Sequence, residues 1–219
     1  MRIATWNVER LVHKRALPEI ISACEQAKAD ILILTETDEQ IRPQFRYCFR
    51  TPCPVGVMPG YYRATENRVS IFSNYKCVRQ YPTYDEYTAL CVELETELGS
   101  LCVYGTIMGI EGNRRPSFKE DLQIQVADFA RLVSDGKHIC IGGDYNISFS
   151  DNYYFTNFGR DTLLRSFAEN RVQLLTENAT ECIDHIAVSE GFVKGKEICF
   201  EEWNLDKRLS DHKGIVVTI

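Results

Sequence analysis

Short apolar runs typical of β-strands recur along the whole chain, and they constrain its fold more than any other feature. Only three segments, residues 16–28, 117–133 and 162–169, predict helices instead. The helices are interspersed among the strands without strict alternation, so we predict an α/β fold of mixed sheets covered by helices. The predicted strands are residues 2–7, 31–36, 68–72, 89–94, 100–108, 138–141, 172–175, 184–188, 196–200 and 214–219.

The length and composition of the chain fit one folded unit. With 219 residues, 44% of them hydrophobic, it can bury one substantial core, so we predict a single domain spanning residues 1–219. Ser117, with Glu120 three residues later, is predicted to cap the second helix. The formal net charge of −6 provides no overall attraction for a polyanion. Any nucleic acid would therefore have to be bound by a local group of basic residues.

Nothing in the sequence indicates secretion or insertion into a membrane. The first residues, MRIATWNVERL, contain no apolar stretch of signal-peptide length, and no run of about 18 apolar residues occurs. The nine cysteines are scattered without a C-x-x-C pair, several within apolar runs, and we interpret them as buried, reduced thiols. We expect a cytoplasmic protein with no membrane partner.

Five of the predicted strands or their flanking turns carry polar side chains at one end. A side chain in such a position is held by rigid backbone and still points into a shared crevice. Each one singly is also explained by a turn or a cap, but the five together favour a functional site. The residues are Asn7, Glu36, Asp144 with Asn146, Asp184, and Asp211 with His212.

These residue types suit the hydrolysis of phosphate esters. A hard cation such as Mg²⁺ binds oxygen ligands, commonly one or two carboxylates with several waters and a substrate phosphate. Glu36, Asp211 and the amide oxygen of Asn7 are therefore candidate ligands or supports for a metal. His212, oriented by a carboxylate such as Asp184, could stay protonated and bind developing phosphoryl charge, or carry a proton.

The segment GGDYN has a geometry that suits a catalytic pair. Its two glycines let the chain turn sharply at the end of the preceding strand. Residues two apart can point the same way, so Asp144 and Asn146 can work together.

At these positions the sequence resembles a known family. The ordered series TWNVE, LTE, GGDYN, IDHIAVS and SDHKGI is similar to the signature motifs of the endonuclease/exonuclease/phosphatase superfamily, and the match extends from residue 5 to residue 215. That superfamily includes apurinic endonucleases, pancreatic-type deoxyribonucleases, inositol polyphosphate 5-phosphatases and sphingomyelinases. The resemblance implies a four-layer α/β sandwich, in which two mixed β-sheets pack face to face with helices on the outside.

The resemblance also implies how the metal and the attacking water are held. Glu36 would hold the metal, Mg²⁺ or alternatively Mn²⁺, with Asn7 and Asp211 beside it. Asp144 would orient or deprotonate the attacking water. Asn7 thus belongs to both the metal set and the catalytic set.

The remaining motif residues are implied to act on the phosphate. Asn146 would bind a phosphate oxygen or the attacking water. Asp184 would hydrogen-bond His212, and His212 would contact the scissile phosphate.

One position departs from the motifs of this superfamily. Most members carry a His, or in apurinic endonucleases a Tyr, at the end of the strand that here reads VYGTIMG, and Ile107 occupies that place. Tyr104 or Thr106 could replace the missing donor to the phosphate, although strand alternation puts both on the face opposite to Ile107. Packing within the fold is the alternative role for Tyr104. We expect altered substrate handling or a lower rate, because the metal set is complete.

Basic and aromatic residues near the strand ends are candidates for binding substrate. Arg10 follows the first strand, and Arg114 and Arg115 follow the strand at 100–108, where they would either clamp phosphates or belong to a solvated surface. Aromatic residues, among them Tyr145 and Tyr153, crowd the chain from GGDYN onward. They would either stack on bases or pack in the core.

Three functions are compatible with these observations. The first is a Mg²⁺-dependent hydrolase of phosphodiester bonds, a nuclease acting on DNA or RNA. The second is a phosphomonoesterase of a small phosphorylated molecule such as an inositol or sugar phosphate, which would need a closed pocket rather than a long positive track. The third, a non-catalytic binding module, predicts decay of the metal set, which the sequence does not show. We favour the first.

Overall fold

The computed structural model describes residues 1–219, and its regular elements follow the apolar runs of the sequence. The helices are α1 (Leu17–Gln26), α2 (Ser117–Ser134), α3 (Asn157–Glu169) and α4 (Glu190–Val193), with three short 3₁₀ turns at Glu9–Leu11, Lys14–Ala16 and Pro54–Gly56. The strands are β1 (Arg2–Asn7), β2 (Ile31–Asp38), β3 (Tyr47–Arg50), β4 (Glu66–Ser73), β5 (Lys76–Tyr81), β6 (Ala89–Thr96), β7 (Gly99–Ile107), β8 (Ile139–Asp144), β9 (Val172–Leu174), β10 (Asp184–Ser189), β11 (Cys199–Trp203) and β12 (Gly214–Thr218).

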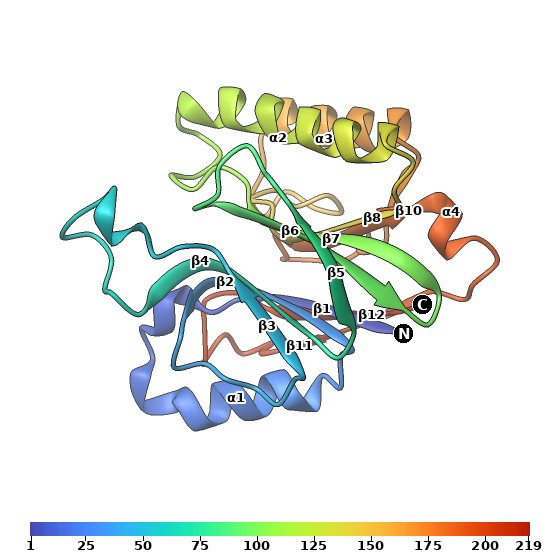
Figure 1. The fold of residues 1–219 in the computed structure, drawn as a ribbon. Helices are drawn as coiled ribbons and strands as arrows, with labels where there is room; N and C mark the ends of the chain where they lie inside the picture. The colour runs from blue at the N-terminus through green and yellow to red at the C-terminus, as the bar shows by residue number, and fades with distance from the viewer.

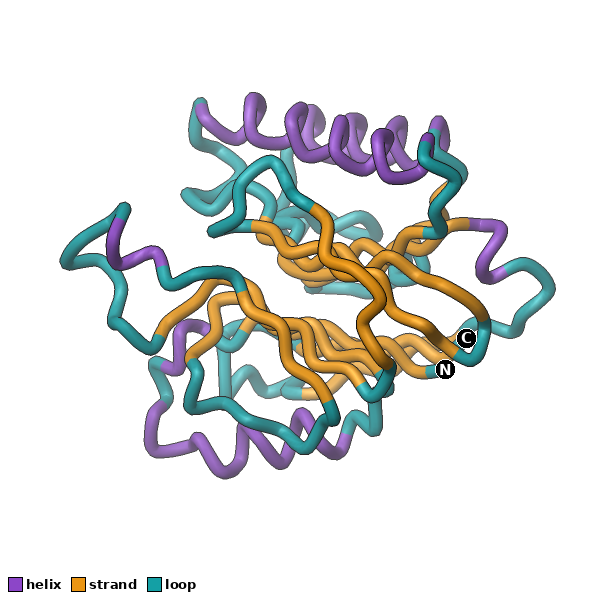
Figure 2. The backbone as a smooth tube through the Cα atoms, viewed as in Figure 1, coloured by secondary structure: helices purple, strands orange, loops and turns teal.

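The strands form two six-stranded sheets that pack face to face. One sheet has the order β11-β12-β1-β2-β4-β3, and the other has the order β5-β6-β7-β8-β10-β9. Figure 1 shows α1 on the outer face of the first sheet and α2 with α3 on the outer face of the second. The same four layers are visible when the backbone is coloured by secondary structure (Figure 2). The four-layer α/β sandwich expected from the sequence is confirmed.

The two sheets share a pattern of strand directions that brings the strand ends together. Each contains one parallel pair, β1 with β2 and β7 with β8, flanked by antiparallel neighbours. Parallel neighbours require a crossover connection, and α1 and α2 lie in these two connections. Strand β10 runs antiparallel to β8 with Asp184 opposite Asp144, so the start of one strand meets the end of the other. This arrangement gathers polar residues at one edge of the sandwich.

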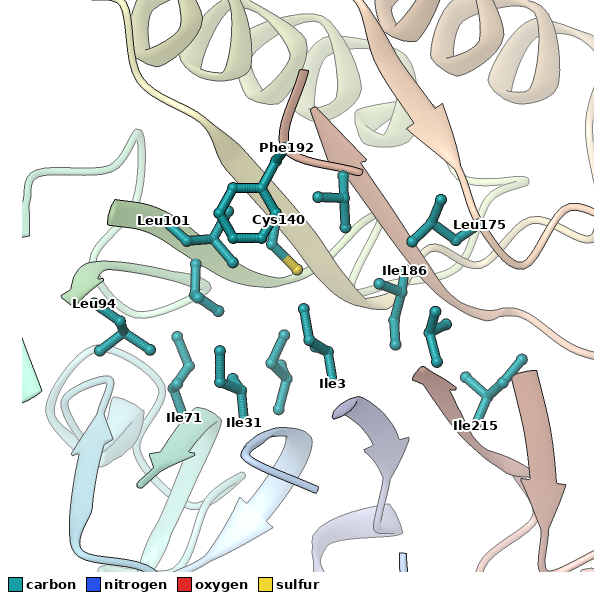
Figure 3. Close-up of a cluster of buried hydrophobic side chains, with 14 of the residues drawn as sticks. Ile3, Ile31, Ile71, Leu94, Leu101, Cys140, Leu175, Ile186, Phe192 and Ile215 are labelled. Atoms are coloured by element: carbon teal, nitrogen blue, oxygen red, sulfur yellow. The ribbon is translucent and has the colours of Figure 1, made fainter. Parts of the chain in front are cut away.

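Three apolar clusters hold the layers together. The largest contains 20 buried residues and lies between the sheets, with Ile3 and Ile31 from the first sheet facing Cys140 and Ile186 from the second (Figure 3). A cluster of 18 buried residues joins the second sheet to α2 and α3, and one of 13 joins the first sheet to α1. Burial of apolar surface on both faces of both sheets stabilises the backbone that carries the site.

Some local expectations differ from the structure. The sequence does not predict strands β3 and β5, which are edge strands without a buried residue and without apolar periodicity. The Ser117 cap is wrong, because α2 begins after Pro116 and the Ser117 hydroxyl instead donates to Glu111 at 3.3 Å. All nine cysteines are free; five are buried as expected, whereas Cys48 and Cys199 are exposed. None of the helices combines the length and apolar character that a membrane crossing requires.

Candidate active site

Asn7 links carboxylates from both sheets at the centre of the site. Its amide nitrogen donates to Glu36 Oε1 at 3.3 Å and to Asp144 Oδ2 at 3.1 Å, while its amide oxygen accepts from the Glu9 backbone at 2.9 Å. Asn7 is 1% exposed, and it ends β1 beside β2. The amide therefore holds two negative groups at a fixed separation.

Glu36 has an unusual backbone conformation for a strand residue. Its φ angle is 45°, in the left-handed region, and the pairing of β2 with β4 skips this position. A non-glycine residue in that region costs about 1 kcal/mol or more, and such strain gathers at functional sites. In this conformation the Glu36 carboxylate lies within hydrogen-bond distance of the Asn7 amide.

Asp144 ends β8 directly after Gly142 and Gly143, and Gly143 permits close contact with β7. Gly143 has a φ of 138°, and a Cβ at this position would overlap the carbonyl oxygen of Thr106. Glycine is therefore required immediately before the Asp144 carboxylate. Asp144 Oδ1 accepts from the backbone of Asn146 at 2.8 Å, which locks the carboxylate in place.

Asn146 follows in a left-handed conformation, with φ 52°. Its side-chain nitrogen donates to the carbonyl oxygens of Met108 at 3.0 Å and Gly109 at 3.4 Å. Its backbone carbonyl accepts from Asn113 at 2.6 Å. Asn146 therefore joins the loop after β8 to the loop after β7, and it also lines the neighbouring cavity.

Asp184 and His212 form a hydrogen-bonded ion pair beside these residues. His212 Nδ1 donates to Asp184 Oδ2 at 2.5 Å, and Asp184 is 1% exposed. The second carboxylate oxygen, Asp184 Oδ1, is buried without a hydrogen-bond partner. The backbone carbonyl of His212 accepts from Trp6 at 3.0 Å and from Asn204 at 2.7 Å, so the turn that presents the imidazole is fixed.

Burial and neighbouring charge shift the pKa values of three site residues. Burial raises the pKa of Asp144 to about 7, with Asp184 acting in the same direction and His212 opposing it. Burial alone would lower the pKa of His212, but the charge and hydrogen bond of Asp184 outweigh it and raise the pKa to about 10. Burial also raises the pKa of Glu36, partly opposed by the hydrogen bond from Asn7. His212 is therefore a cation at neutral pH, beside a carboxyl that can exchange a proton there.

Asp211 lies at the rim of the site. Its side chain is 69% exposed, and its Oδ1 lies 3.7 Å from His212 Nε2. Its backbone nitrogen donates to Glu9 Oε2 at 3.2 Å. Its charge contributes to the raised pKa of Glu36, so the two carboxylates are close enough to repel each other.

The oxygen groups around Glu36 fit a hard divalent cation. The structure contains no group of three or more His, Cys, Asp or Glu side chains arranged to hold a metal. Mg²⁺, however, needs only one or two carboxylates, because it keeps several waters. The largely buried Glu36 carboxylate has the Asn7 amide as its side-chain hydrogen-bond partner and forms no ion pair, so a cation would compensate its charge. The Asn7 oxygen, which accepts one hydrogen bond, retains a lone pair for such an ion.

Neither candidate replaces the donor missing at Ile107. Ile107 is 1% exposed and pairs with Asp144 in the register of β7 with β8. Tyr104 is fully buried and donates to Asp128 on α2 at 3.0 Å. Thr106 is fully buried and donates to Gln125 on α2 at 2.9 Å. The proposed substrate contact of Tyr104 is therefore wrong, because strand alternation turns its ring and hydroxyl to the helix side.

Tyr145 is also removed from the site. It is fully buried in the cluster beneath α2 and α3, and its hydroxyl donates to the carbonyl of Ile141 at 2.9 Å. The substrate-binding role predicted for Tyr145 is therefore wrong. The alternation that lets Asp144 and Asn146 act as a pair sends the residue between them to the opposite face.

The three candidate arginines differ in their surroundings. Arg10 pairs with the buried Glu66 at 2.9 Å and lies over the rings of Tyr61 and Tyr62, with distances of 4.7 and 4.6 Å to the ring centres. It therefore fixes the loop before β4. Arg114 and Arg115 are exposed on the loop that follows β7, which Asn113 connects to the site.

A cavity of about 370 Å³ opens beside His212 and contains residues that the sequence did not single out. Its wall includes Lys207 and Lys213 together with Tyr153 and Tyr154. The tyrosines belong to the aromatic segment noted in the sequence. Lys213 stands within the motif SDHKGI and Lys207 shortly before it, so their closeness in sequence to His212 was a usable signal.

A family model decides to which family this chain belongs. The model described as the Endonuclease/Exonuclease/phosphatase family matches residues 4–212. The chain belongs to this family. It is therefore an enzyme of the phosphoesterase type, and the family is typically metal-dependent. A search of curated proteins found no match to this sequence.

Solved structures with this fold cover essentially the whole chain. An endonuclease/exonuclease/phosphatase from Beutenbergia cavernae has a TM-score of 0.71 at 16% identity, covering 99% of this chain and 70% of that one. A 3′ phosphatase from Neisseria bound to product DNA hairpin has a TM-score of 0.65 at 19% identity, with 100% and 99% covered. An AP endonuclease from Archaeoglobus fulgidus has a TM-score of 0.67 at 15% identity, with 100% and 99% covered. At these identities the likeness establishes the fold alone.

Proposed function

We propose that this chain is a Mg²⁺-dependent hydrolase of phosphodiester bonds that acts as a nuclease on DNA or RNA. The observation that carries the proposal is the cluster of largely buried carboxylates, one amide and one imidazole at one edge of the sandwich. Asn7 joins Glu36 to Asp144, and the Asp184–His212 pair lies next to them. A buried site with fixed carboxylates and a fixed imidazolium suits phosphoryl transfer, in which positioning and electrostatic stabilisation provide most of the catalysis.

The two titrating groups divide the chemistry between them. Asp144, whose pKa burial raises to about 7, is suited to orient a water and accept its proton. His212, whose pKa lies at about 10 because Asp184 outweighs the effect of burial, is suited to donate hydrogen bonds to the phosphoryl oxygens. Asn146 lines the cavity beside His212 and is suited to position the phosphate or the water.

The proposed metal would be held by Glu36, with Asp211 and Asn7 as further ligands or supports. Mg²⁺, or Mn²⁺ in its place, would supply Lewis-acid stabilisation of the charge that develops on phosphoryl oxygens. The buried Glu36 carboxylate, without an ion pair, supports this assignment.

The relatives and the cavity point to two substrate classes. The Neisseria protein is described as a 3′ phosphatase and is bound to product DNA, and the Archaeoglobus protein is described as an AP endonuclease. Both descriptions favour phosphate esters of DNA. The second candidate, a phosphomonoesterase of a small molecule, is supported by the limited cavity volume of about 370 Å³, which lies at the small end for ligand pockets.

A substrate panel tests the proposal. Wild-type protein is assayed with bis-p-nitrophenyl phosphate, p-nitrophenyl phosphate, abasic DNA, single-stranded DNA, RNA and inositol phosphates, with Mg²⁺ and then with EDTA. We expect hydrolysis of the diester and of at least one nucleic acid, and its loss in EDTA. Hydrolysis of the monoesters alone would show that the chain is a phosphomonoesterase and not a nuclease. Activity that persists undiminished in EDTA would remove the metal from the proposal.

A further inference from the structure

The cavity beside His212 contains a cation that no carboxylate neutralises. Lys207 lines this cavity and is half-buried. Its ammonium donates to the hydroxyl of Tyr153 at 2.7 Å and lies 4.5 Å from the centre of the Tyr153 ring, and it forms no ion pair. An ammonium group has three donors, so donors remain for a ligand.

The other lysine of the cavity is already engaged. Lys213 donates to the carbonyl of Thr180 at 2.8 Å and pairs with Glu202 at 3.4 Å. The cavity therefore has one neutralised lysine and one available lysine. This difference identifies Lys207 as the group that would meet an incoming anion.

A buried polar atom independently indicates that the cavity receives a ligand. Asp184 lines the cavity and is 1% exposed, yet its Oδ1 has no hydrogen-bond partner. A buried acceptor without a partner costs about 1–3 kcal/mol, so a donor on a bound molecule would satisfy it. Hydroxyl groups of a sugar or a cyclitol are donors of this kind.

The charges on the remaining wall do not cancel Lys207. Asp184 is paired with His212, and Glu181 is exposed at the rim. Asp211 faces His212 at 3.7 Å and is 69% exposed. The wall thus offers His212 at one place and Lys207 at another as separate positive groups.

We propose that Lys207, held by Tyr153, forms a subsite for a second phosphate of the substrate, distinct from the phosphate that His212 contacts. This inference rests on the proposed function of the His212 site. The shared chemistry is a hydroxylated molecule that carries two phosphates, which is either a ribonucleotide unit of a strand or a small bisphosphate. In both cases the ammonium binds the additional phosphate, and Asp184 accepts from a hydroxyl of the unit between the two phosphates.

Binding titrations test the subsite without relying on turnover. Uridine 3′,5′-bisphosphate, which keeps a 2′-hydroxyl, and uridine 5′-monophosphate are titrated into full-length wild-type protein and Lys207→Gln by calorimetry, in EDTA to prevent metal-dependent hydrolysis. We expect Lys207→Gln to raise Kd for the bisphosphate about tenfold and to leave Kd for the monophosphate unchanged, since a charged hydrogen bond is lost at a half-buried position. Equal effects on both ligands, or no effect on either, would overturn the subsite.

Two further variants separate the subsite from general electrostatics. Arg208→Gln removes a neighbouring cation that is exposed and paired with Glu19 outside the cavity, and it should leave both Kd values unchanged. Tyr153→Phe removes the hydroxyl that positions Lys207 and should raise Kd for the bisphosphate about threefold. A loss in Arg208→Gln as large as in Lys207→Gln would show a diffuse charge effect and would contradict the assignment.

A second ligand pair distinguishes the sources of the phosphate. Inositol 1,4-bisphosphate and inositol 1-phosphate are titrated in the same way. Lys207 dependence in the uridine pair assigns the subsite to a ribonucleotide strand, and dependence in the inositol pair assigns it to a small bisphosphate. Because these titrations need no catalysis, a wild-type protein inactive on every substrate would defeat the proposed function while leaving this result readable.

Discussion

The interior and the rim of the site are built on different principles. In the interior, Asn7, Asp144 and Asp184 are between 1% and 3% exposed, and each side chain has a hydrogen-bond partner at a fixed distance on another strand or in the loop beside it. At the rim, the Asp211 side chain is 69% exposed, and the Lys207 ammonium binds one tyrosine hydroxyl. Interior groups are therefore preorganised by the fold, whereas rim groups retain freedom to meet a ligand.

This difference predicts which substitutions alter chemistry and which alter binding. Charges in a low-dielectric interior interact strongly, and exposed charges are screened by water and salt. Substitutions in the interior should lower kcat or the free energy of unfolding. Substitutions at the rim should change affinity by small factors and leave stability nearly unchanged.

Replacing the carboxylate behind His212 should produce one of the two largest effects. Asp184→Asn keeps the shape and removes the charge that raises the pKa of His212. We expect kcat for bis-p-nitrophenyl phosphate to fall about a thousandfold, since an amide no longer stabilises the positive charge on the imidazole. Glu181→Gln, an exposed carboxylate on the rim of the same cavity, is the matched control and should retain activity. Comparable losses in both variants would break the distinction between interior and rim.

A buried histidine beneath the site gives a pH signature. His185 is fully buried, its Nε2 lies 3.0 Å from the carbonyl of Ile147 and its Nδ1 lies 2.9 Å from the hydroxyl of Thr176. Burial lowers its pKa from 6.5 to about 4. The folded state therefore resists protonation, so the stability linked to this group is complete above pH 6.5 and is lost as the pH falls toward 4.

Urea unfolding at two pH values measures that signature. Between about pH 7.5 and about pH 5, the wild type should lose about 2 kcal/mol more unfolding free energy than His185→Gln, since glutamine does not titrate. His138→Gln replaces an exposed histidine and should follow the wild-type curve. If His185→Gln and the wild type lost stability in parallel, the histidine would not be buried in its neutral form.

Arg10 and Arg114 allow the same comparison between a paired arginine and an exposed one. Arg10→Gln removes one partner of Glu66, whose side chain is 3% exposed and which keeps Arg63. We expect the free energy of unfolding to fall by about 1–2 kcal/mol, with KM for DNA unchanged. Arg114→Gln, at an exposed position, should change stability by less than about 0.5 kcal/mol. If Arg10→Gln raised KM for DNA and left the free energy of unfolding unchanged, Arg10 would be a substrate-binding residue.

The fold and the interior of the site could be predicted because strand ends carry a strong signal. Apolar runs of the right length located β1, β2 and β8, and a polar residue that ends such a run has its position fixed by the sheet. Asn7, Glu36 and Asp144 are therefore in contact, although they are far apart in the sequence. The left-handed turn at Glu36 could not be predicted, because glutamate has no intrinsic preference for that conformation, and the pairing of β2 with β4 skips this position.

The rim could not be predicted, because it depends on which way side chains point and on long-range pairing. Tyr145 lies within the motif GGDYN, but it belongs to the core beneath α2 and α3. Lys207 and Lys213 are both near His212 in sequence, and only the structure shows that Lys213 forms an ion pair with Glu202. Composition alone cannot separate a neutralised cation from an available one.

The central claim is that buried Asp144 is the group that activates water for phosphoester hydrolysis, and one substitution tests it most directly. Steady-state turnover of bis-p-nitrophenyl phosphate in Mg²⁺ is measured for Asp144→Asn and for the wild type, together with the melting temperature of each. The account predicts a loss of kcat of about a thousandfold with the fold retained. The amide removes the proton acceptor and a charge that burial disfavours, while its nitrogen gives up one hydrogen bond, from Asn7 or from Asn146. Turnover by Asp144→Asn equal to that of the wild type would contradict it.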